Sequence, residues 1–332
     1  MGYAIAFLCF PLKLFAISLL IMVFGFRIMI KVLRYELLKN PKLPPGPKPW
    51  PIIGARFDGH KGKVKKGMRT MKKYHHPIVE ERMKQWSDAS KAIEEDLLDV
   101  MISLKDHSNK PILTSKEIKA LTIEIMLGGA DNPSNAVECA LAEMINQPNM
   151  LQLATEEVDR VVGKKRMVEE SDVPNLNYVK ACVREAFRLH PVVPFNPPHV
   201  SANDTMIGNY FIPKGSHVLL SRQGLGQNPK VWTEPHVFKP EQHFNNEKSM
   251  ISLSDPDLKL ISFGTGRRGC PAAILGTSMT VVLLARLLHA FTWTAPPNVS
   301  TINLAKSHNG GMLAQPLVLL PKPRLPPVLY YM

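Results

Sequence analysis

Cys270 lies in a glycine-rich loop that runs directly into an apolar stretch, and this arrangement restricts what the chain can form more than any other feature. The loop reads Phe263-Gly-Thr-Gly-Arg-Arg-Gly-Cys-Pro271, and Ala272 to Phe291 has the apolar content of a helix. A sulfur at the start of a helix, beside Arg267 and Arg268, is favoured as the thiolate because the helix dipole and both cations stabilise negative charge. The alternative is a buried structural cysteine, which does not need two arginines and three glycines around it.

A thiolate at Cys270 is a candidate metal ligand, and it would be the only ligand that the protein supplies. The other cysteines, Cys9, Cys139 and Cys182, lie far from it and form no CxxC pair, which argues against a disulfide scaffold or a zinc finger. No second cysteine or histidine stands beside Cys270 in the loop. A single protein ligand suits an iron whose other ligands come from a porphyrin.

The N-terminal stretch from Tyr3 to Phe26 predicts a membrane span. It carries one charge, Lys13, and as a helix it would reach about 36 Å, enough for a hydrocarbon core of roughly 30 Å. A cleaved signal peptide is the alternative, but it predicts a shorter apolar core and a small-residue cleavage site. Basic residues follow the stretch from Arg27 to Lys42, so the positive-inside bias places the rest of the chain in the cytosol.

A proline-rich segment follows this predicted anchor. Six prolines between Pro41 and Pro51 favour a stiff, extended strut, either a generic linker or a hinge that sets how a catalytic body sits on a membrane. We therefore expect a membrane anchor at residues 1–30, a basic and proline-rich hinge at 31–54, and a catalytic domain at 55–332.

The stretch from Gly59 to Lys73 carries seven basic residues and no acidic one. It is either a solvated helix face or a surface that docks to an acidic partner or to anionic lipid. The whole chain has 41 lysines and arginines against 28 acidic residues, a formal net charge of +13. Nucleic-acid binding needs a basic patch with interleaved aromatic side chains, and the predicted anchor and the Cys270 loop argue against that class.

Several segments of the body have the pattern of regular structure. Tyr210 to Leu220 reads as a β-hairpin that turns at Lys214-Gly215. Helical periodicity predicts helices over residues 87–106, 115–147, 149–163 and 178–190.

The helix predicted over 115–147, with Ser115 as its cap and Glu117 in its first turn, has an unusual centre. Gly128-Gly-Ala-Asp-Asn-Pro133 contains residues that weaken a helical ladder, so we expect a break there. A helix broken in this way suggests a site and not only packing.

Glu185 and Arg188 are three residues apart on the helix predicted over 178–190, so they share one face and can pair. If exposed, the pair would be worth only a few tenths of a kcal/mol, about what a common surface pair contributes.

Taken together, these motifs resemble those of the cytochromes P450, the haem-thiolate monooxygenases. The family's haem-ligand signature matches Phe263, Gly266, Arg268 and Cys270, and its Glu-x-x-Arg motif matches Glu185 and Arg188. The Leu-His-Pro after that helix, the proline-rich hinge and the apolar N-terminus also fit. The resemblance implies a mainly α fold with small β-sheets, preceded by one transmembrane helix.

Four stretches are similar to one branch of that family, the plant amino-acid N-monooxygenases. This branch carries asparagine and proline where most cytochromes P450 have threonine after the acid of the central helix, as at Asn132 and Pro133. The resemblance implies two hydroxylations of the amino nitrogen of an L-amino acid, with loss of carbon dioxide and water to give an aldoxime. The four stretches are Asp131–Glu138, Arg188–Pro191, Pro194–Asn196 and Ser262–Cys270.

The resemblance also implies roles for single residues around a haem b. Cys270 would be the axial iron ligand with Phe263 and Gly266 beside it, and Arg268 and His199 would hold the haem propionates. The other expected roles are proton relay over the distal face by Asp131 and Asn132, bracing of the core by Glu185 and Arg188, and lining of the substrate pocket by Gly128, Gly129 and Phe195.

As partners, the resemblance implies an NADPH-cytochrome P450 reductase, membrane lipid and an L-amino-acid substrate. NADPH would be used only indirectly, through that reductase. The expected location is the endoplasmic reticulum membrane, spanned once, with the catalytic body in the cytosol.

The sequence departs from the family in three places. Family members are longer, and the missing segment would fall between Ile53-Gly54 and Asp58-Gly59. Gln242 stands where the family has an arginine that pairs with Glu185, so we expect Glu185 to have one cationic partner. Ala272 stands where the signature has glycine. These departures suggest as an alternative a non-catalytic, membrane-anchored remnant with impaired haem binding.

Overall fold

The computed structural model describes residues 60–244, 250–254, 258–307 and 311–331. The predicted anchor and hinge lie outside these residues. The described chain divides into a larger unit, 60–197 with 220–331, and a smaller unit, 198–219. Its regular structure is mainly helical with two-stranded sheets, as expected.

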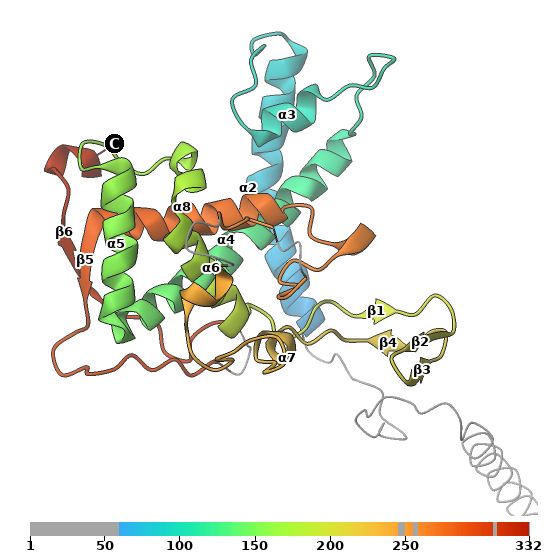
Figure 1. Ribbon diagram of the computed structural model, residues 1–332. Helices are drawn as coiled ribbons and strands as arrows, with labels where there is room; N and C mark the ends of the chain where they lie inside the picture. The colour runs from blue at the N-terminus through green and yellow to red at the C-terminus, as the bar shows by residue number, and fades with distance from the viewer. Residues whose placement is uncertain (1–59, 245–249, 255–257, 308–310, 332) are drawn as a thin grey trace, which may run out of the picture. The chain divides into compact units, whose positions relative to one another are not determined.

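The larger unit is built around α8, Ala273–Ala290, which follows the Cys270 loop (Figure 1). It packs against α4 (Ser115–Asn146), α5 (Pro148–Val162) and α6 (Asn177–Leu189). The remaining elements of this unit are α2 (His60–Ser87), α3 (Leu97–Ser103), η1 (Glu170–Asn175), α7 (Arg222–Gly226), η2 (Pro240–His243), η3 (Gly266–Arg268), β5 (Phe291–Thr294), β6 (Leu320–Pro323) and η4 (Pro327–Tyr330).

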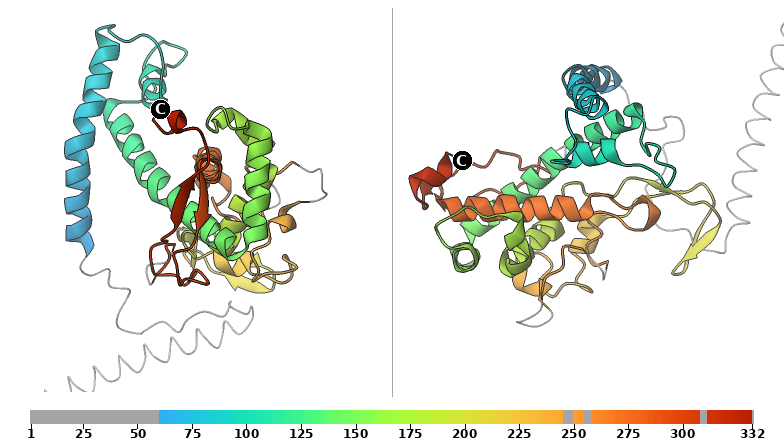
Figure 2. Two further views of the ribbon diagram at one scale, coloured as in Figure 1. Left: turned by 90° about the vertical axis from the view of Figure 1, so that its left-hand side faces the viewer. Right: turned by 90° about the horizontal axis from the view of Figure 1, so that it is seen from above.

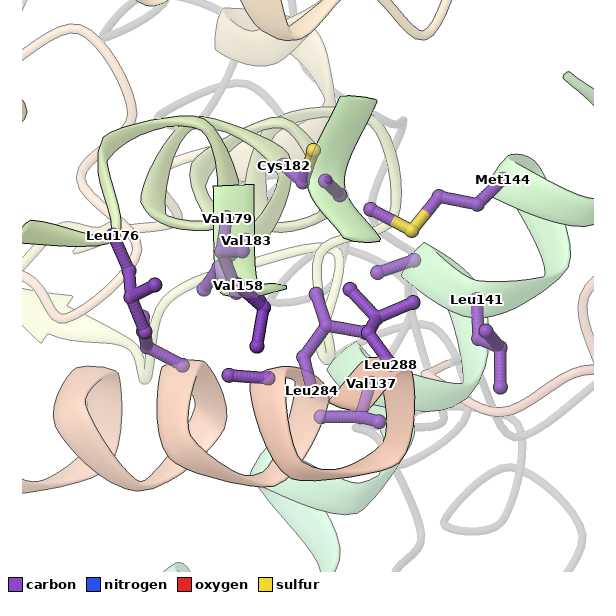
Figure 3. Close-up of a cluster of buried hydrophobic side chains, with 14 of the residues drawn as sticks. Val137, Leu141, Met144, Val158, Leu176, Val179, Cys182, Val183, Leu284 and Leu288 are labelled. Atoms are coloured by element: carbon purple, nitrogen blue, oxygen red, sulfur yellow. The ribbon is translucent and has the colours of Figure 1, made fainter. Parts of the chain in front are cut away.

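The main hydrophobic core lies where α4, α5, α6 and α8 meet (Figure 3). Leu284 and Leu288 of α8 are buried against side chains of the other three helices, among them Val137, Val158 and Val183. Each such side chain contributes about 1.5–3 kcal/mol by leaving water. Among the described helices only α8 is long and apolar enough to cross a membrane, but half of it is buried in this core.

The helix expected over 87–106 is wrong in most of its length. Helix α2 continues to Ser87, and only Leu97–Ser103 is helical after it. Asp96 caps α3 by accepting a hydrogen bond from the Asp99 amide at 3.0 Å. Ile93, which the apolar periodicity of a helix over 87–106 would bury, is exposed. The intervening residues turn away from a helix because their polar side chains bond the backbone instead.

Helices α2, α3 and α4 lie together at the N-terminal end of α4 (Figure 2), and a second, smaller core lies between them. Val79, Met101 and Ile118, one from each helix, are buried there. Beside them Asp99 is buried and accepts hydrogen bonds from Arg82 at 2.8 Å and Trp86 Nε1 at 2.9 Å. Asp99 thus ties α3 to α2.

Acid is expected to loosen α3 through Asp99. Burial raises the pKa of Asp99, but donation from Trp86, Arg82 and the Glu95 amide outweighs it, so the pKa lies well below its usual 3.8. A depressed folded-state pKa gives stability that is present above pH 3.8 and is lost as the pH falls further. Hydrogen exchange of the α3 amides should therefore accelerate in acid, and Asp99→Asn should remove that acceleration. Equal acid dependence in both proteins would contradict this role.

Helix α4 is continuous, so the break expected at its centre is wrong. Its cap is also one residue earlier than expected, because Thr114 and Glu117 form a reciprocal capping box. Pro133 stands inside the helix and is buried. A helical proline costs about 3 kcal/mol. The helix persists because the turns after Pro133 are buried in the main core.

The hairpin expected over 210–220 is wrong in its pairing. In the smaller unit β3 (Tyr210–Ile212) pairs with β2 (Thr205–Ile207) across a Gly208-Asn209 turn. Strand β4 (His217–Val218) pairs instead with β1 (His199–Val200). The chain does turn at Gly215, which has a φ of +82° that favours glycine, but this turn joins strands of different sheets.

Candidate functional site

The loop before α8 is shaped by two glycines in left-handed conformation. Gly264 and Gly266 have φ values of +69° and +68°, which strain any residue with a Cβ. The Cys270 amide donates to the Phe263 carbonyl at 2.8 Å, closing the loop. The order of glycines in the sequence therefore fixes the path that carries Cys270 to the start of α8.

Phe263 anchors this loop to the helices beneath it. Its ring meets Phe187 of α6 edge to face, with centroids 5.6 Å apart. It also lies over Gly276 of α8, where an added Cβ would be 3.4 Å from the ring. The loop is thus held between α6 and α8.

Cys270 itself is exposed, unlike Cys139 and Cys182, which are buried. The alternative of a buried structural cysteine therefore does not describe Cys270. Arg267 and Arg268 are exposed beside it in η3. No group of three or more histidine, cysteine or acidic side chains in the described part of the chain could hold a metal. A metal bound at Cys270 needs its remaining ligands from a cofactor.

The surroundings of Cys270 fit a haem. The first turn of α8 exposes Ile274 and Leu275, at 66% and 41% of their surface, so apolar surface lies next to the thiol. A porphyrin is a flat apolar group with two carboxylates, and apolar side chains together with arginines match that chemistry. This fit rests on a thiol, exposed apolar side chains and cations in one short segment.

The centre of α4 also reaches the surface, where Gly128 is exposed and Gly129 is half-buried. Gly128 and Gly129 have open space where a Cβ would stand, and Asp131 and Asn132 are exposed. The Asn132 side-chain amide donates to the Gly128 carbonyl at 2.9 Å. That bond fixes the orientation of the side-chain amide. The side-chain oxygen of Asn132 accepts no hydrogen bond within the described chain.

Glu185 and Arg188 are fully buried, so the surface pair that their spacing alone would suggest is wrong. The guanidinium donates to both carboxylate oxygens of Glu185 at 2.7 Å. It also donates to the carbonyls of Gly226, Pro235 and Val237. The pair therefore joins α6 to the segment that follows α7.

His243 supplies the further partner of Glu185 that was not expected. Its Nε2 lies 2.9 Å from Glu185, and the Gln242 amide nitrogen lies 3.3 Å away. Burial lowers the pKa of His243, although Glu185 opposes the shift, so the ring is neutral near neutral pH and donates Nε2–H. Glu185 thus has one cation, as expected, but two neutral donors replace the second. His243 stands next to Gln242 in sequence, yet only the fold shows that both side chains reach Glu185.

Phe195 and His199 are the two expected site residues that remain. Phe195 is 47% exposed and bridges to Ser221 through its backbone. His199 is exposed in β1 of the smaller unit, whereas Cys270 belongs to the larger unit. A pocket of about 400 Å³ lies between α5 and η1, lined by residues such as Glu157, Arg160 and Asn175. None of the expected site residues lines it.

Comparisons with known proteins agree with the motif assignment. Residues 37–321 match the family described as Cytochrome P450. Isoleucine N-monooxygenase 1 of Lotus japonicus is 58% identical over 82% of this chain and 51% of its own length. Tyrosine N-monooxygenase of Sorghum bicolor is 52% identical over 85% and 50%, and phenylalanine N-monooxygenase of Arabidopsis thaliana is 52% identical over 85% and 53%. The chain spans about half the length of these relatives.

Proposed function

Because the chain belongs to the cytochrome P450 family, we propose that it is a haem-thiolate monooxygenase that N-hydroxylates an L-amino acid to an aldoxime. The observation that carries this proposal is the exposed Cys270 thiol, presented by a two-glycine loop with no competing ligand cluster among the described residues. The printed names of the similar proteins support the choice of an amino-acid substrate.

In this proposal the Cys270 sulfur would bind the iron of a haem b. Phe263 packs beside the ligand loop, and Gly266 gives the loop its left-handed turn. Arg268 and His199 hold the propionates, since a guanidinium and an imidazole can each donate to a carboxylate. When bound, the haem supplies the oxygen chemistry, and the thiolate ligand favours O–O cleavage.

Asp131 and Asn132 handle protons in the proposed reaction. The side-chain nitrogen of Asn132 donates to the Gly128 carbonyl. The side-chain oxygen of Asn132 is therefore oriented to accept a hydrogen bond. Asp131 is exposed and can exchange a proton with water. Gly128 and Gly129 leave room for substrate beside these groups, and Phe195 offers it an apolar side chain.

Electrons reach the site from NADPH through a membrane-bound cytochrome P450 reductase. The body lies on the cytosolic side of the endoplasmic reticulum membrane, with residues 1–30 as its anchor, 31–54 as its hinge and 55–332 as the catalytic domain. This location is consistent with the free, reduced state of the described cysteines.

A second candidate is a non-catalytic, membrane-anchored remnant that binds haem poorly. The observation that favours it is length, since the chain spans about half of each similar protein. A shorter body buries less of a bound haem and excludes less water from it.

Substrate turnover separates the two candidates. The full chain would be expressed in microsomes with a cytochrome P450 reductase, given each protein amino acid and NADPH, and assayed for aldoxime by mass spectrometry. Aldoxime from at least one amino acid supports the monooxygenase. No aldoxime from any amino acid, together with little or no bound haem, supports the remnant, and haem bound through Cys270 without aldoxime would indicate an intermediate, degraded state.

Removing the Asn132 side chain is expected to lower aldoxime formation while leaving the haem in place. Asn132 does not titrate, but removing one preorganised hydrogen-bonding group from a reacting centre costs roughly 10²-fold in rate, so Asn132→Ala should lose about that factor. The reduced, carbon-monoxide-bound spectrum should be unchanged. The matched control is Ser134→Ala, since Ser134 is also exposed and bonds the Ala130 carbonyl one turn back. Equal losses in the two variants would show that the effect comes from the helix and not from Asn132.

A further inference from the structure

The N-terminal half of α2 carries a basic face whose charges no group in the described chain neutralises. Five exposed cations form this face: Lys65, Lys66, Arg69, Lys72 and Lys73. At 3.6 residues per turn they fall within an arc of about 120° on one side of the helix. No acidic residue stands between Lys61 and Val79. None of the ion pairs among the described residues includes any of the five cations.

This arrangement costs the helix stability. Arg69 stands three or four residues from each of the other four cations, and like charges at that spacing repel each other on a helix surface. The first turn of α2 holds no acidic residue that would offset the positive end of the helix dipole. The C-terminal half differs, because Glu80 pairs there with Lys119 and Arg82 pairs with Asp99. A local rule that is broken in one half of a helix only indicates a function for that half.

The basic face points away from the side of α2 that packs. Met71 is half-buried and His75 is buried, and both lie outside the arc of the cations. Tyr74 and Ile78 are 67% and 63% exposed just beyond that arc, and the Lys73 ammonium lies 5.5 Å from the centre of the Tyr74 ring. Both views of Figure 2 show α2 at the edge of the larger unit. The face is therefore open to a large, flat partner.

An anionic lipid surface fits this face better than an acidic protein does. Four of the five cations are lysines, which act as hydrated point charges, whereas docking to protein carboxylates favours the bidentate contacts of arginine. An exposed tyrosine and isoleucine beside the cations suit the boundary between headgroups and acyl chains. The position in the chain is a further reason. Only residues 27–64 separate Lys65 from the predicted span, so the face stays close to a bilayer.

We propose that the basic face of α2 lies against the anionic surface of the membrane that the predicted anchor crosses. This rests on the predicted anchor and not on haem binding. Attraction to anionic headgroups falls off within a Debye length, so the cations lie within about 10 Å of the surface. The contact gives the body of the chain a second attachment and restricts how it turns on its hinge.

The test measures how fast acetic anhydride, a small neutral reagent, modifies individual lysines of the full chain reconstituted in vesicles. One set of vesicles is phosphatidylcholine alone, and the other is phosphatidylcholine with phosphatidylserine. An anionic surface shields a lysine and holds it protonated, so Lys66 and Lys73 should react several-fold more slowly in the second set. Lys230, exposed after α7, should react equally in both. Salt at about 1 M, which shortens the Debye length to about 3 Å, should abolish the difference.

Substitution tests whether the face itself is responsible. A variant with Lys65→Gln, Arg69→Gln and Lys72→Gln removes three charges, each worth roughly fivefold in lipid attraction, and should abolish the slowing at Lys66 and Lys73. The matched control, Lys65→Arg with Lys72→Arg, keeps every charge and should preserve the slowing. Both variants should match the parent chain in phosphatidylcholine alone, because all the substituted side chains are exposed.

Equal rates at Lys66 and Lys73 in the two kinds of vesicle would overturn the proposal and leave an acidic protein as the occupant of this face. The same slowing in the glutamine variant as in the parent chain would also overturn it. Neither haem nor aldoxime is measured, so these results are independent of the test of the proposed monooxygenase.

Discussion

Replacing Cys270 by serine is expected to abolish the red-shifted Soret band of the reduced, carbon-monoxide-bound protein. That band reports a thiolate opposite the carbon monoxide, and Cys270 is the one exposed cysteine described. No cluster of other ligands in the described chain can take its place. The loss should be complete, because a serine hydroxyl stays neutral and binds iron weakly. Difference spectra of microsomes with equal amounts of each protein would measure it.

The controls for this prediction are the two buried cysteines. Cys139→Ala and Cys182→Ala remove thiols that lie in the cores and should leave the position of the band unchanged. Burial raises the pKa of both thiols, so neither is a ready source of thiolate. A band that persists in Cys270→Ser would contradict the assignment, and the ligand would then be sought among the other cysteines.

The ligand loop and α8 could be predicted from the sequence because their determinants are local. Glycines allow positive φ at two positions of the loop, and an uninterrupted apolar run gives α8 within one residue of its observed ends. The helices α5 and α6 were also predicted to within one residue. In each case the residues that decide the structure are neighbours in the chain.

The predictions from sequence were wrong where residues far apart in the chain determine the local structure. The local propensity of Gly128 to Pro133 predicts a break, but burial of the following turns keeps α4 helical. The 210–220 segment has the pattern of two strands, but each pairs with a strand nearer the N-terminus.

Glu185→Gln is expected to destabilise the larger unit by about 3–5 kcal/mol, the cost of leaving a buried charge without its partner. The substitution hardly changes the shape of the side chain. The change in the free energy of unfolding therefore measures the loss of the negative charge. Arg188 would keep its bonds to three backbone carbonyls but lose the anion that balances it, at a position with no exposure to water. His243 and the Lys239 amide would each compete for a weaker acceptor.

Urea unfolding of the detergent-solubilised full chain would measure this loss. Glu156→Gln is the matched control: Glu156 is exposed on α5, so the same change of charge should alter the free energy of unfolding by less than about 0.5 kcal/mol. The pH dependence gives a second check. Since the pKa of His243 is lowered in the folded state, its contribution to stability is complete above pH 6.5 and falls as the pH drops below that value. A small loss in Glu185→Gln, close to that of the control, would mean that the buried pair orders the segment after α7 without stabilising it.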